Sequence, residues 1–135
     1  MKNKFRGFSE RLNKLVYGYL VEDCMIVNGI VEVNDQYISI ESWETVVPES
    51  VGQYTGLKDL NGVEIYEGDL LSIQIVRDAK KTVTIVFEDG AFGVKDELFG
   101  WGYGKEFYPL KTIINNHKVE IAGNIYQNKD LLEDK

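Results

Sequence analysis

The chain has 135 residues, of which 44% are hydrophobic and 12% aromatic, and its formal net charge is −7 at pH 7. This length and apolar content suffice for one domain, or for a barrel with a subdomain, around a hydrophobic core. The acidic balance argues against a general affinity for nucleic acid, because binding by counterion release requires Lys and Arg clustered on a surface.

The cysteine content and the hydropathy of the chain limit the cellular compartments and the kinds of site that we expect. Cys24 is the single cysteine, which excludes an intramolecular disulfide and a multi-cysteine metal site. No apolar run approaches the roughly 20 residues of a transmembrane helix, and residues 1–15 carry charges where a signal peptide would be apolar. We therefore expect a cytoplasmic protein with no membrane contact, no metal and no cofactor.

Charge is unevenly distributed over the first part of the chain. Residues 1–20 hold a single acid, Glu10, and five cations: Lys2, Lys4, Arg6, Arg11 and Lys14. Residues 22–53 hold no Lys or Arg and seven acids: Glu22, Asp23, Glu32, Asp35, Glu41, Glu44 and Glu49. We interpret the asymmetry as a basic segment that pairs with an acidic one. A basic contact with nucleic acid is the functional alternative.

Short antiparallel strands are predicted over the first third of the chain, where β-branched and aromatic residues alternate with polar ones. The predicted strands are residues 5–9, 15–21, 25–27, 30–33 and 37–41. Asn28-Gly29 is expected to form the turn of a hairpin, with the next turn at Asn34-Asp35.

Residues 10–21 have an alternative, because their apolar positions also satisfy the spacing of an α-helix. The β-forming run at Tyr17, Gly18 and Tyr19 favours the strand. Pro48 excludes Val47 from α geometry, and we interpret it as the boundary at which the N-terminal part of the chain ends. We predict an N-terminal β-rich subdomain of residues 1–50 and a second domain of residues 51–135.

Residues 53–69, with the sequence QYTGLKDLNGVEIYEGD, combine turn signals with short apolar anchors. Asn61-Gly62 predicts a type I′ turn, whose two central positions need positive φ. Asp59 and Asp69 are expected to accept backbone N–H groups in Asx-type turns. Glu64, Glu67 and Asp69 also suggest paired catalytic carboxylates, but they crowd a turn that has a structural explanation.

Apolar alternation predicts strands over residues 70–77, 81–87 and 91–95, joined by turns at 78–80 and Asp89-Gly90. Three strands joined by short turns form a meander. Later strands at residues 107–110 and 118–121 are expected to close it into a five- or six-stranded antiparallel barrel, which removes its own edges.

The segment GWGYG, residues 100–104, alternates glycine with large aromatic residues. It is not a phosphate loop, since no Lys-Ser or Lys-Thr follows it. One interpretation is a contact for a ligand or partner, because aromatic residues on loops frequently supply binding energy. The other is an ordered turn whose Trp caps the barrel. The candidate binding residues are Trp101, Tyr103, Phe107 and Tyr108.

The end of the chain supplies no reactive group. Residues 112–116 predict a short helical turn, and His117 follows it as the only histidine, so a metal site or a nucleophilic pair cannot be assembled around it. Asn128 is expected to act as the N-cap of a brief C-terminal helix over residues 129–133. No catalytic residues are therefore proposed, and the chain is not expected to be an enzyme.

Several motifs together resemble one family. QYTGLKDLNGVEIYEGDLL is followed by VFEDGAFGVK, EFYPL and VEIAGNIYQNKDLLE, and this combination resembles the YopX family of phage and prophage proteins of Gram-positive bacteria. KFRGF, residues 4–8, is also similar to the family's KFRAW-type start, so the likeness covers nearly the whole chain. The resemblance implies a bacterial host and a small SH3-like barrel in the C-terminal part with an N-terminal extension. It implies no reaction.

Two classes of function remain open. The first is a non-enzymatic interaction module that contacts a host or phage protein through residues 99–108, including a variant in which the acidic protein competes for a DNA-binding surface. The alternative is a nucleic-acid accessory factor, which rests on analogy with other SH3-like barrels alone. Exposed N-terminal strands also make a homo-oligomer an open possibility.

Overall fold

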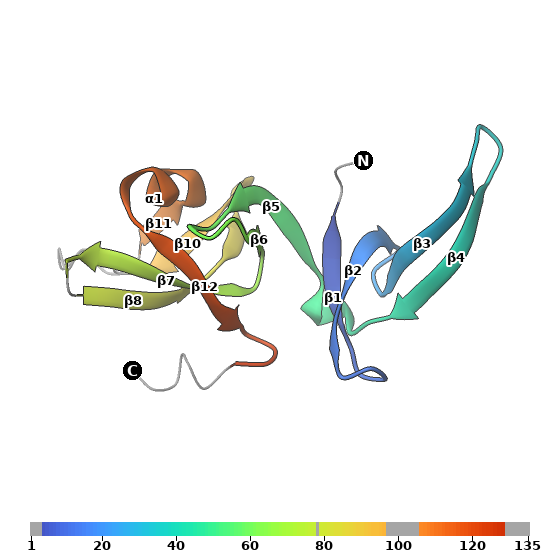
Figure 1. Cartoon of the computed structure of the whole chain (residues 1–135), viewed down its shortest axis with the longest axis horizontal. Coiled ribbons are helices and arrows are strands. Elements are labelled where there is room, and N and C mark those ends of the chain that lie inside the picture. Colours follow the sequence, from blue (N-terminus) through green and yellow to red (C-terminus); the bar gives the residue numbers. More distant parts are fainter. Residues whose placement is uncertain (1–3, 78, 97–105, 129–135) are drawn as a thin grey trace. The chain divides into compact units, whose positions relative to one another are not determined.

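The computed structural model describes residues 4–77, 79–96 and 106–128, and for residues 30–33, 38, 40 and 41 it describes the backbone alone. Strands and turns make up most of this part of the chain, with one short α-helix and one 3₁₀ turn (Figure 1). The predicted mainly β class is confirmed. The chain divides into two compact units, Met1–Tyr54 and Thr55–Lys135. The predicted assignment of domains to residues 1–50 and 51–135 stays a prediction.

The first unit contains the neighbouring antiparallel strands β4-β3-β2-β1-β5 of a six-stranded sheet whose order is β4-β3-β2-β1-β5-β6. Its elements are β1 (Phe5–Ser9), β2 (Lys14–Val21), β3 (Met25–Val33), β4 (Ile38–Thr45), the 3₁₀ turn η1 (Pro48–Ser50) and the first residues of β5 (Gly52–Lys58). The strand predicted for residues 15–21 is confirmed. β1 to β4 pair in chain order, for example Phe8 with Leu15 and Ile26 with Glu44, whereas β5 pairs with β1, where Gln53 lies opposite Phe5.

The hairpin turn predicted at Asn28-Gly29 is wrong. β3 runs through both residues, and its register with β4 shifts around Gly29, which pairs with Ser42. The Asn-Gly pair therefore forms a bulge, which places an extra residue in one strand of the ladder. The hairpin turns instead at Asn34, whose side-chain oxygen accepts the N–H groups of Gln36 and Tyr37. That turn is where the sequence predicted the next one.

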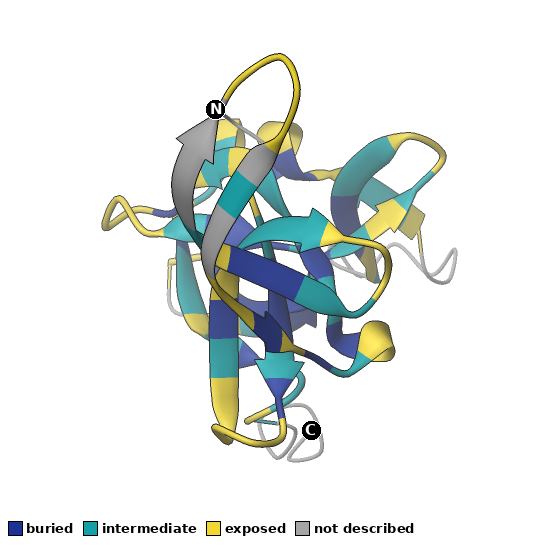
Figure 2. Cartoon of the chain, turned by 90° about the vertical axis from the view of Figure 1, so that its right-hand side faces the viewer, coloured by how far each residue is buried: buried dark blue, intermediate teal, exposed yellow. Residues whose placement is uncertain are grey.

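A small core closes one face of the first sheet. Val16, Ile26 and Val46 are buried, and Phe5, Leu20 and Val51 pack against them. Figure 2 shows buried and exposed positions side by side along the strands, with the loops at their ends mostly exposed. At Gly18 the strands β2 and β3 approach so closely that a Cβ would lie 2.1 Å from the carbonyl oxygen of Val27. Only glycine fits there.

Gly18→Ala is expected to destabilise the protein by about 1–3 kcal/mol, because the added methyl group meets a backbone atom that cannot rotate away. Chemical denaturation followed by circular dichroism measures the change. An unchanged unfolding midpoint would show that β2 and β3 separate at this point without cost.

The second unit contains two three-stranded sheets, ordered β12-β7-β8 and β11-β10-β9. Its elements are the end of β5, β6 (Glu64–Tyr66), β7 (Asp69–Val76), β8 (Ala79–Thr84), β9 (Val86–Glu88), β10 (Ala91–Asp96), β11 (Glu106–Pro109), α1 (Leu110–Asn116) and β12 (Val119–Asn124). Within the described ranges no sheet closes into a barrel. The helix predicted at residues 129–133 lies outside these ranges, while the helical turn expected at 112–116 is part of α1.

The strand predicted for residues 81–87 is divided, because the chain passes from one sheet to the other at Ile85. The Ile85 N–H donates to the Asp69 carbonyl, and its own carbonyl accepts the N–H of Gly68, both at 2.9 Å. Its side chain is fully buried. β8 therefore ends at Thr84 and β9 starts at Val86, and both sheets share one core, formed by Ile65, Leu71, Ile73, Val83, Ile85, Val94, Leu110, Ile113 and Val119.

The type I′ turn lies at a different dipeptide from the predicted one. Gly62 has φ +82°, but Asn61 is not among the described residues with positive φ, so Asn61-Gly62 is a turn of another type. Asp89 and Gly90 have φ +53° and +84°, as both central positions of a type I′ turn require. They join β9 to β10, where Glu88 pairs with Ala91.

Asp59 fixes the turn before β6, as the Asx interpretation predicted. Its Oδ1 atom accepts the N–H groups of Asn61 and Val63, each at 2.9 Å, and its Oδ2 atom accepts the Ile121 N–H at 3.0 Å. The residue is buried. One carboxylate therefore satisfies three backbone donors and joins a turn to strand β12, 62 residues further along the chain.

Asp59→Ala is expected to cost about 1–3 kcal/mol for each N–H group left without an acceptor. Asp59→Asn keeps one oxygen for Asn61 and Val63 but turns an amide NH₂ toward the Ile121 N–H, so it should cost less. Urea denaturation of both variants checks the order. Equal losses would mean that the carboxylate acts through its charge and not through these three bonds.

Candidate functional site

The aromatic residues that the sequence selected as binding candidates divide into two pairs. Trp101 and Tyr103 lie outside the described residues. Phe107 and Tyr108 are on β11, both partly buried. Tyr108 packs against the core of the second unit, and a Cβ at Gly93 would lie 2.7 Å from the Phe107 ring, so that ring covers the strand backbone directly. This pair contributes to folding, and its binding role stays a prediction.

The first unit has a cleft that sequence reasoning missed. Its volume is about 650 Å³, within the range of small-molecule binding sites. The lining comes from the β1–β2 turn and from the end of β4 with the segment after it: Glu10, Arg11, Trp43, Glu44, Thr45, Val46, Val47 and Pro48. These two segments are more than thirty residues apart in the sequence, so no local motif marks the cleft.

An ion pair between an exposed Arg11, whose side chain is 72% exposed, and a buried Glu44 carboxylate forms one wall of the cleft. The Glu44 side chain is 9% exposed and lies on the core side of β4, opposite Ile26. Arg11 donates to both carboxylate oxygens, from Nη2 at 2.6 Å and from Nε at 3.0 Å, and the Ser9 hydroxyl donates a third bond at 3.0 Å. Bidentate pairs of this kind are short and directional. The β1–β2 turn is therefore fixed to β4.

The same contacts set the charge state of the pair. The hydrogen bond from Arg11 lowers the pKa of the Glu44 carboxyl, and burial only partly opposes it, while the Ser9 bond and the charge of Arg11 lower it further. The bond and charge of Glu44 raise the pKa of Arg11. Both groups therefore stay ionised at neutral pH, and the guanidinium is occupied by an internal partner.

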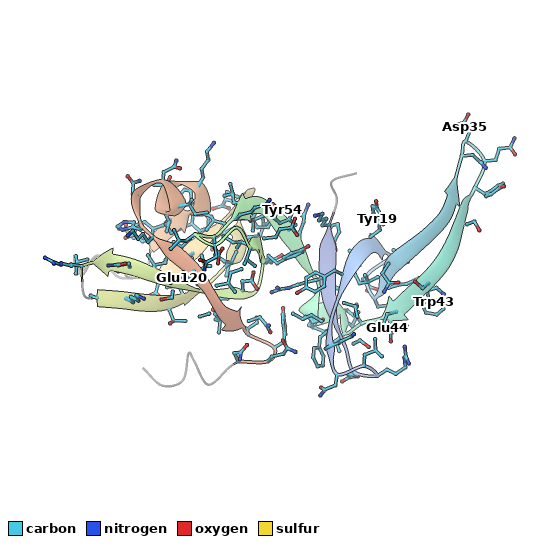
Figure 3. The ribbon with its side chains drawn as sticks, viewed as in Figure 1. Tyr19, Asp35, Trp43, Glu44, Tyr54 and Glu120 are labelled. Carbon is cyan, nitrogen blue, oxygen red and sulfur yellow. The ribbon has the colours of Figure 1, made fainter. Side chains whose placement is uncertain are left out.

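Trp43 lies beside this pair and faces solvent (Figure 3). Its side chain belongs to the face of β4 opposite that of Glu44, and the residue is 53% exposed although its cross-strand neighbour Val27 is only 2% exposed. The indole makes no hydrogen bond to a described residue, and neither does the carboxylate of Glu10. The cleft thus combines an aromatic surface and an available carboxylate on a rigid frame.

The other residues that could take part in catalysis or metal binding make contacts that are explained by a structural role. The Asp69 carboxylate accepts the Tyr66 N–H at 2.7 Å, which supports a structural role for the acidic cluster before β7. His117 Nδ1 lies 3.2 Å from the Gln74 carbonyl oxygen. Burial and Asp23 raise the pKa of the Cys24 thiol, which disfavours the reactive thiolate. Across residues 4–77, 79–96 and 106–128, no three His, Cys, Asp or Glu side chains gather as metal ligands.

The comparisons with known proteins agree with the sequence motifs. The family model described as YopX protein matches residues 4–133, so the chain belongs to the YopX family. It is also similar to a solved structure, the crystal structure of protein EF1440 from Enterococcus faecalis, with 26% sequence identity and a TM-score of 0.67. That match covers 98% of this chain and 99% of the other. No curated protein matches. No helix among the described residues has the length and apolar character to cross a membrane.

Glu44→Gln is expected to lower stability at neutral pH and to reduce acid sensitivity. The folded-state pKa of Glu44 lies below its usual value of about 4.3, so its stabilising effect is present above that value and disappears as pH falls through the folded pKa. The difference in urea midpoint between wild type and variant should therefore shrink below about pH 4.

Asp35→Asn, at the exposed tip of the β3–β4 hairpin, is the matched control and should leave the pH profile unchanged. A constant difference between the Glu44→Gln variant and wild type at every pH would contradict the assigned role of the carboxylate.

Proposed function

We propose that this YopX-family chain is a non-enzymatic interaction module, and that the cleft of the first unit is a contact surface for a host or phage macromolecule in the bacterial cytoplasm. The observation that carries the proposal is the exposure of Trp43 at the rim of a cleft. Tryptophan is among the residues that contribute most binding energy at protein interfaces, especially beside a pocket.

The rigidity of the cleft supports the same function. Arg11, Glu44 and Ser9 are tied together by three hydrogen bonds, and the Leu12 N–H donates to the Ser9 hydroxyl at 3.1 Å. A partner therefore meets an arrangement that is already ordered. Binding to a preorganised surface avoids part of the entropy cost of fixing side chains.

Two finer features belong to the same proposal. The aromatic segment of residues 99–108 is a second contact surface, in line with its glycine-rich composition. The SH3-like arrangement of the second unit is supported by the passage of the chain between two small sheets at Ile85 and by their common core. The acidic composition, by contrast, favours protein over nucleic acid as the partner.

Affinity capture from the bacterial host tests the proposal. Tagged wild type, Trp43→Ala and Phe87→Ala are compared, with and without nuclease. Phe87 is the matched control, since it is an aromatic residue of similar exposure, 51%, on β9 of the other unit. Recovery of a specific partner should fall at least about tenfold in Trp43→Ala, the size of a binding hot spot, and stay unchanged in Phe87→Ala.

Capture that is equal for wild type and Trp43→Ala would remove the cleft from the proposal. A further comparison with Trp101→Ala combined with Tyr103→Ala tests the second surface separately. Loss of the captured material on nuclease treatment would favour the nucleic-acid accessory factor instead.

A further inference from the structure

β4 is the last strand of the first sheet, so one of its two edges has no neighbouring strand in that sheet. In an antiparallel pair, backbone groups of alternate residues face the partner strand or face away from it. The Val46 N–H donates to the Cys24 carbonyl at 2.8 Å, and the register is regular from Val46 back to Trp43. Glu44 therefore faces β3, whereas the N–H and C=O groups of Trp43 and Thr45 face away.

The free edge ends at the cleft. The Val47 N–H donates to the Phe8 carbonyl at 2.9 Å, which turns the chain toward β1 immediately after Thr45. The outward backbone groups of Trp43 and Thr45 thus belong to the same two residues that line the cleft with Glu10 and Arg11. A strand edge beside a cleft is the geometry that receives an extended peptide, because the backbone supplies hydrogen bonds and the cleft receives side chains.

The charges that line the cleft indicate which sign of charge a bound peptide should carry. The cleft is lined by two carboxylates, Glu10 and Glu44, and by one guanidinium that is already bound to Glu44. The Glu10 carboxylate is therefore the uncompensated charge. The other side of the cleft, at Trp43–Pro48, lies in a stretch without cations, since residues 22–57 contain no Lys or Arg. An anionic ligand would meet a guanidinium whose charge is already balanced by Glu44, whereas a cationic side chain meets an available carboxylate.

Trp43 adds a second group suited to a cation. The face of an indole ring attracts an ammonium or guanidinium group placed over it, and tryptophan is the strongest of the aromatic side chains in this respect. Trp43 is exposed, and its backbone lies on the free edge, so a bound strand would run past its ring. The edge, the carboxylate and the aromatic ring thus all favour the same occupant.

We propose that the cleft binds an extended, Lys- or Arg-containing segment of a partner protein as an added strand on β4, with cationic side chains that contact Trp43 and Glu10. This inference rests on the proposed function and specifies the partner's chemistry. Neighbouring residues of an extended strand point to opposite sides, so cations at alternate positions would reach the cleft.

Selection from a displayed library of random dodecapeptides tests the proposal directly. The full-length chain is the target, and peptides that also bind Trp43→Ala are removed; circular dichroism confirms that this variant is folded. Peptides that survive should be positively charged, with Lys or Arg enriched at alternate positions among β-forming residues. Survivors without excess positive charge, or no peptide that depends on Trp43, would overturn the inference.

Backbone methylation of the best selected peptide tests the added strand. N-methyl groups on one alternate set of residues block the hydrogen bonds to β4, and those on the other set point away from it. Methylation of the first set should weaken binding at least about tenfold and methylation of the second should have little effect. Equal effects of the two sets would exclude strand addition.

The contribution of Glu10 has its own pair of variants. Glu10→Gln should weaken binding of the selected peptide by about three- to tenfold at low salt, and by less at high salt, because the interaction is between charges. Asp35→Asn removes an equal charge at the hairpin tip and should leave binding unchanged. Equal losses of affinity in both variants would show that net charge, and not a specific contact of Glu10, determines binding.

The outcomes separate this inference from the proposed function. If capture of a host partner depends on Trp43 but selection yields no cationic peptide, the interaction module stands and its assigned partner chemistry falls. If neither depends on Trp43, the inference falls and the cleft is removed from the proposed function. Self-association in sedimentation experiments that is lost in Trp43→Ala would make a second copy of this chain the occupant and overturn the inference.

Discussion

In each unit a buried carboxylate joins a turn to a strand with which that turn makes no ladder of backbone hydrogen bonds. In the first unit Glu44 accepts three hydrogen bonds, one from Ser9 at the end of β1 and two from Arg11 in the β1–β2 turn. In the second unit Asp59 accepts three backbone N–H groups, one of them from β12. A carboxylate taken out of water is costly unless its oxygens are bonded, so each position enforces a specific arrangement of its neighbours. The candidate cleft depends on this, because its two walls are joined through Glu44.

The strands that these acids connect are short and the cores small. The first unit buries only three hydrophobic residues in its central cluster, with three more packed around them. Such a core leaves large side chains at the surface, and exposed aromatic residues are accordingly found on several strands. Trp43 differs from the others in its position, since it combines a cleft, a fixed ion pair and a strand edge within a few residues.

Much of the strand pattern could be predicted from the sequence, because period-two alternation and local β propensity are properties of each segment alone. Turn geometry was less accessible. Asn28-Gly29, Asn61-Gly62 and Asp89-Gly90 carry the same kind of signal, but only the last adopts two positive φ angles. The choice among a bulge, another turn type and a type I′ turn depends on which strands pair, and that depends on residues far away.

The candidate cleft was outside the reach of sequence reasoning for the same reason. Arg11 and Glu44 are 33 residues apart, and no local motif in either segment identifies them as partners. The charge asymmetry between residues 1–20 and the acidic stretch was the one available signal, and it predicted pairing between the two segments without naming the pair. The division of residues 81–87 was equally hidden, because Ile85 fits the alternation of an unbroken strand.

The acidic character of the β3–β4 region also affects how copies of the protein meet. A strand edge with an exposed tryptophan beside it would ordinarily invite a second copy to pair with it and to continue into larger assemblies. The sequence around this edge contains only acidic charged residues, so two such edges approach against mutual repulsion. That repulsion acts over a Debye length of roughly 10 Å at 0.1 M salt. The negative charge that favours a cationic peptide therefore also opposes pairing between two copies of the protein. This repulsion weakens in concentrated salt, and at low salt it keeps the β4 edge free of a second copy.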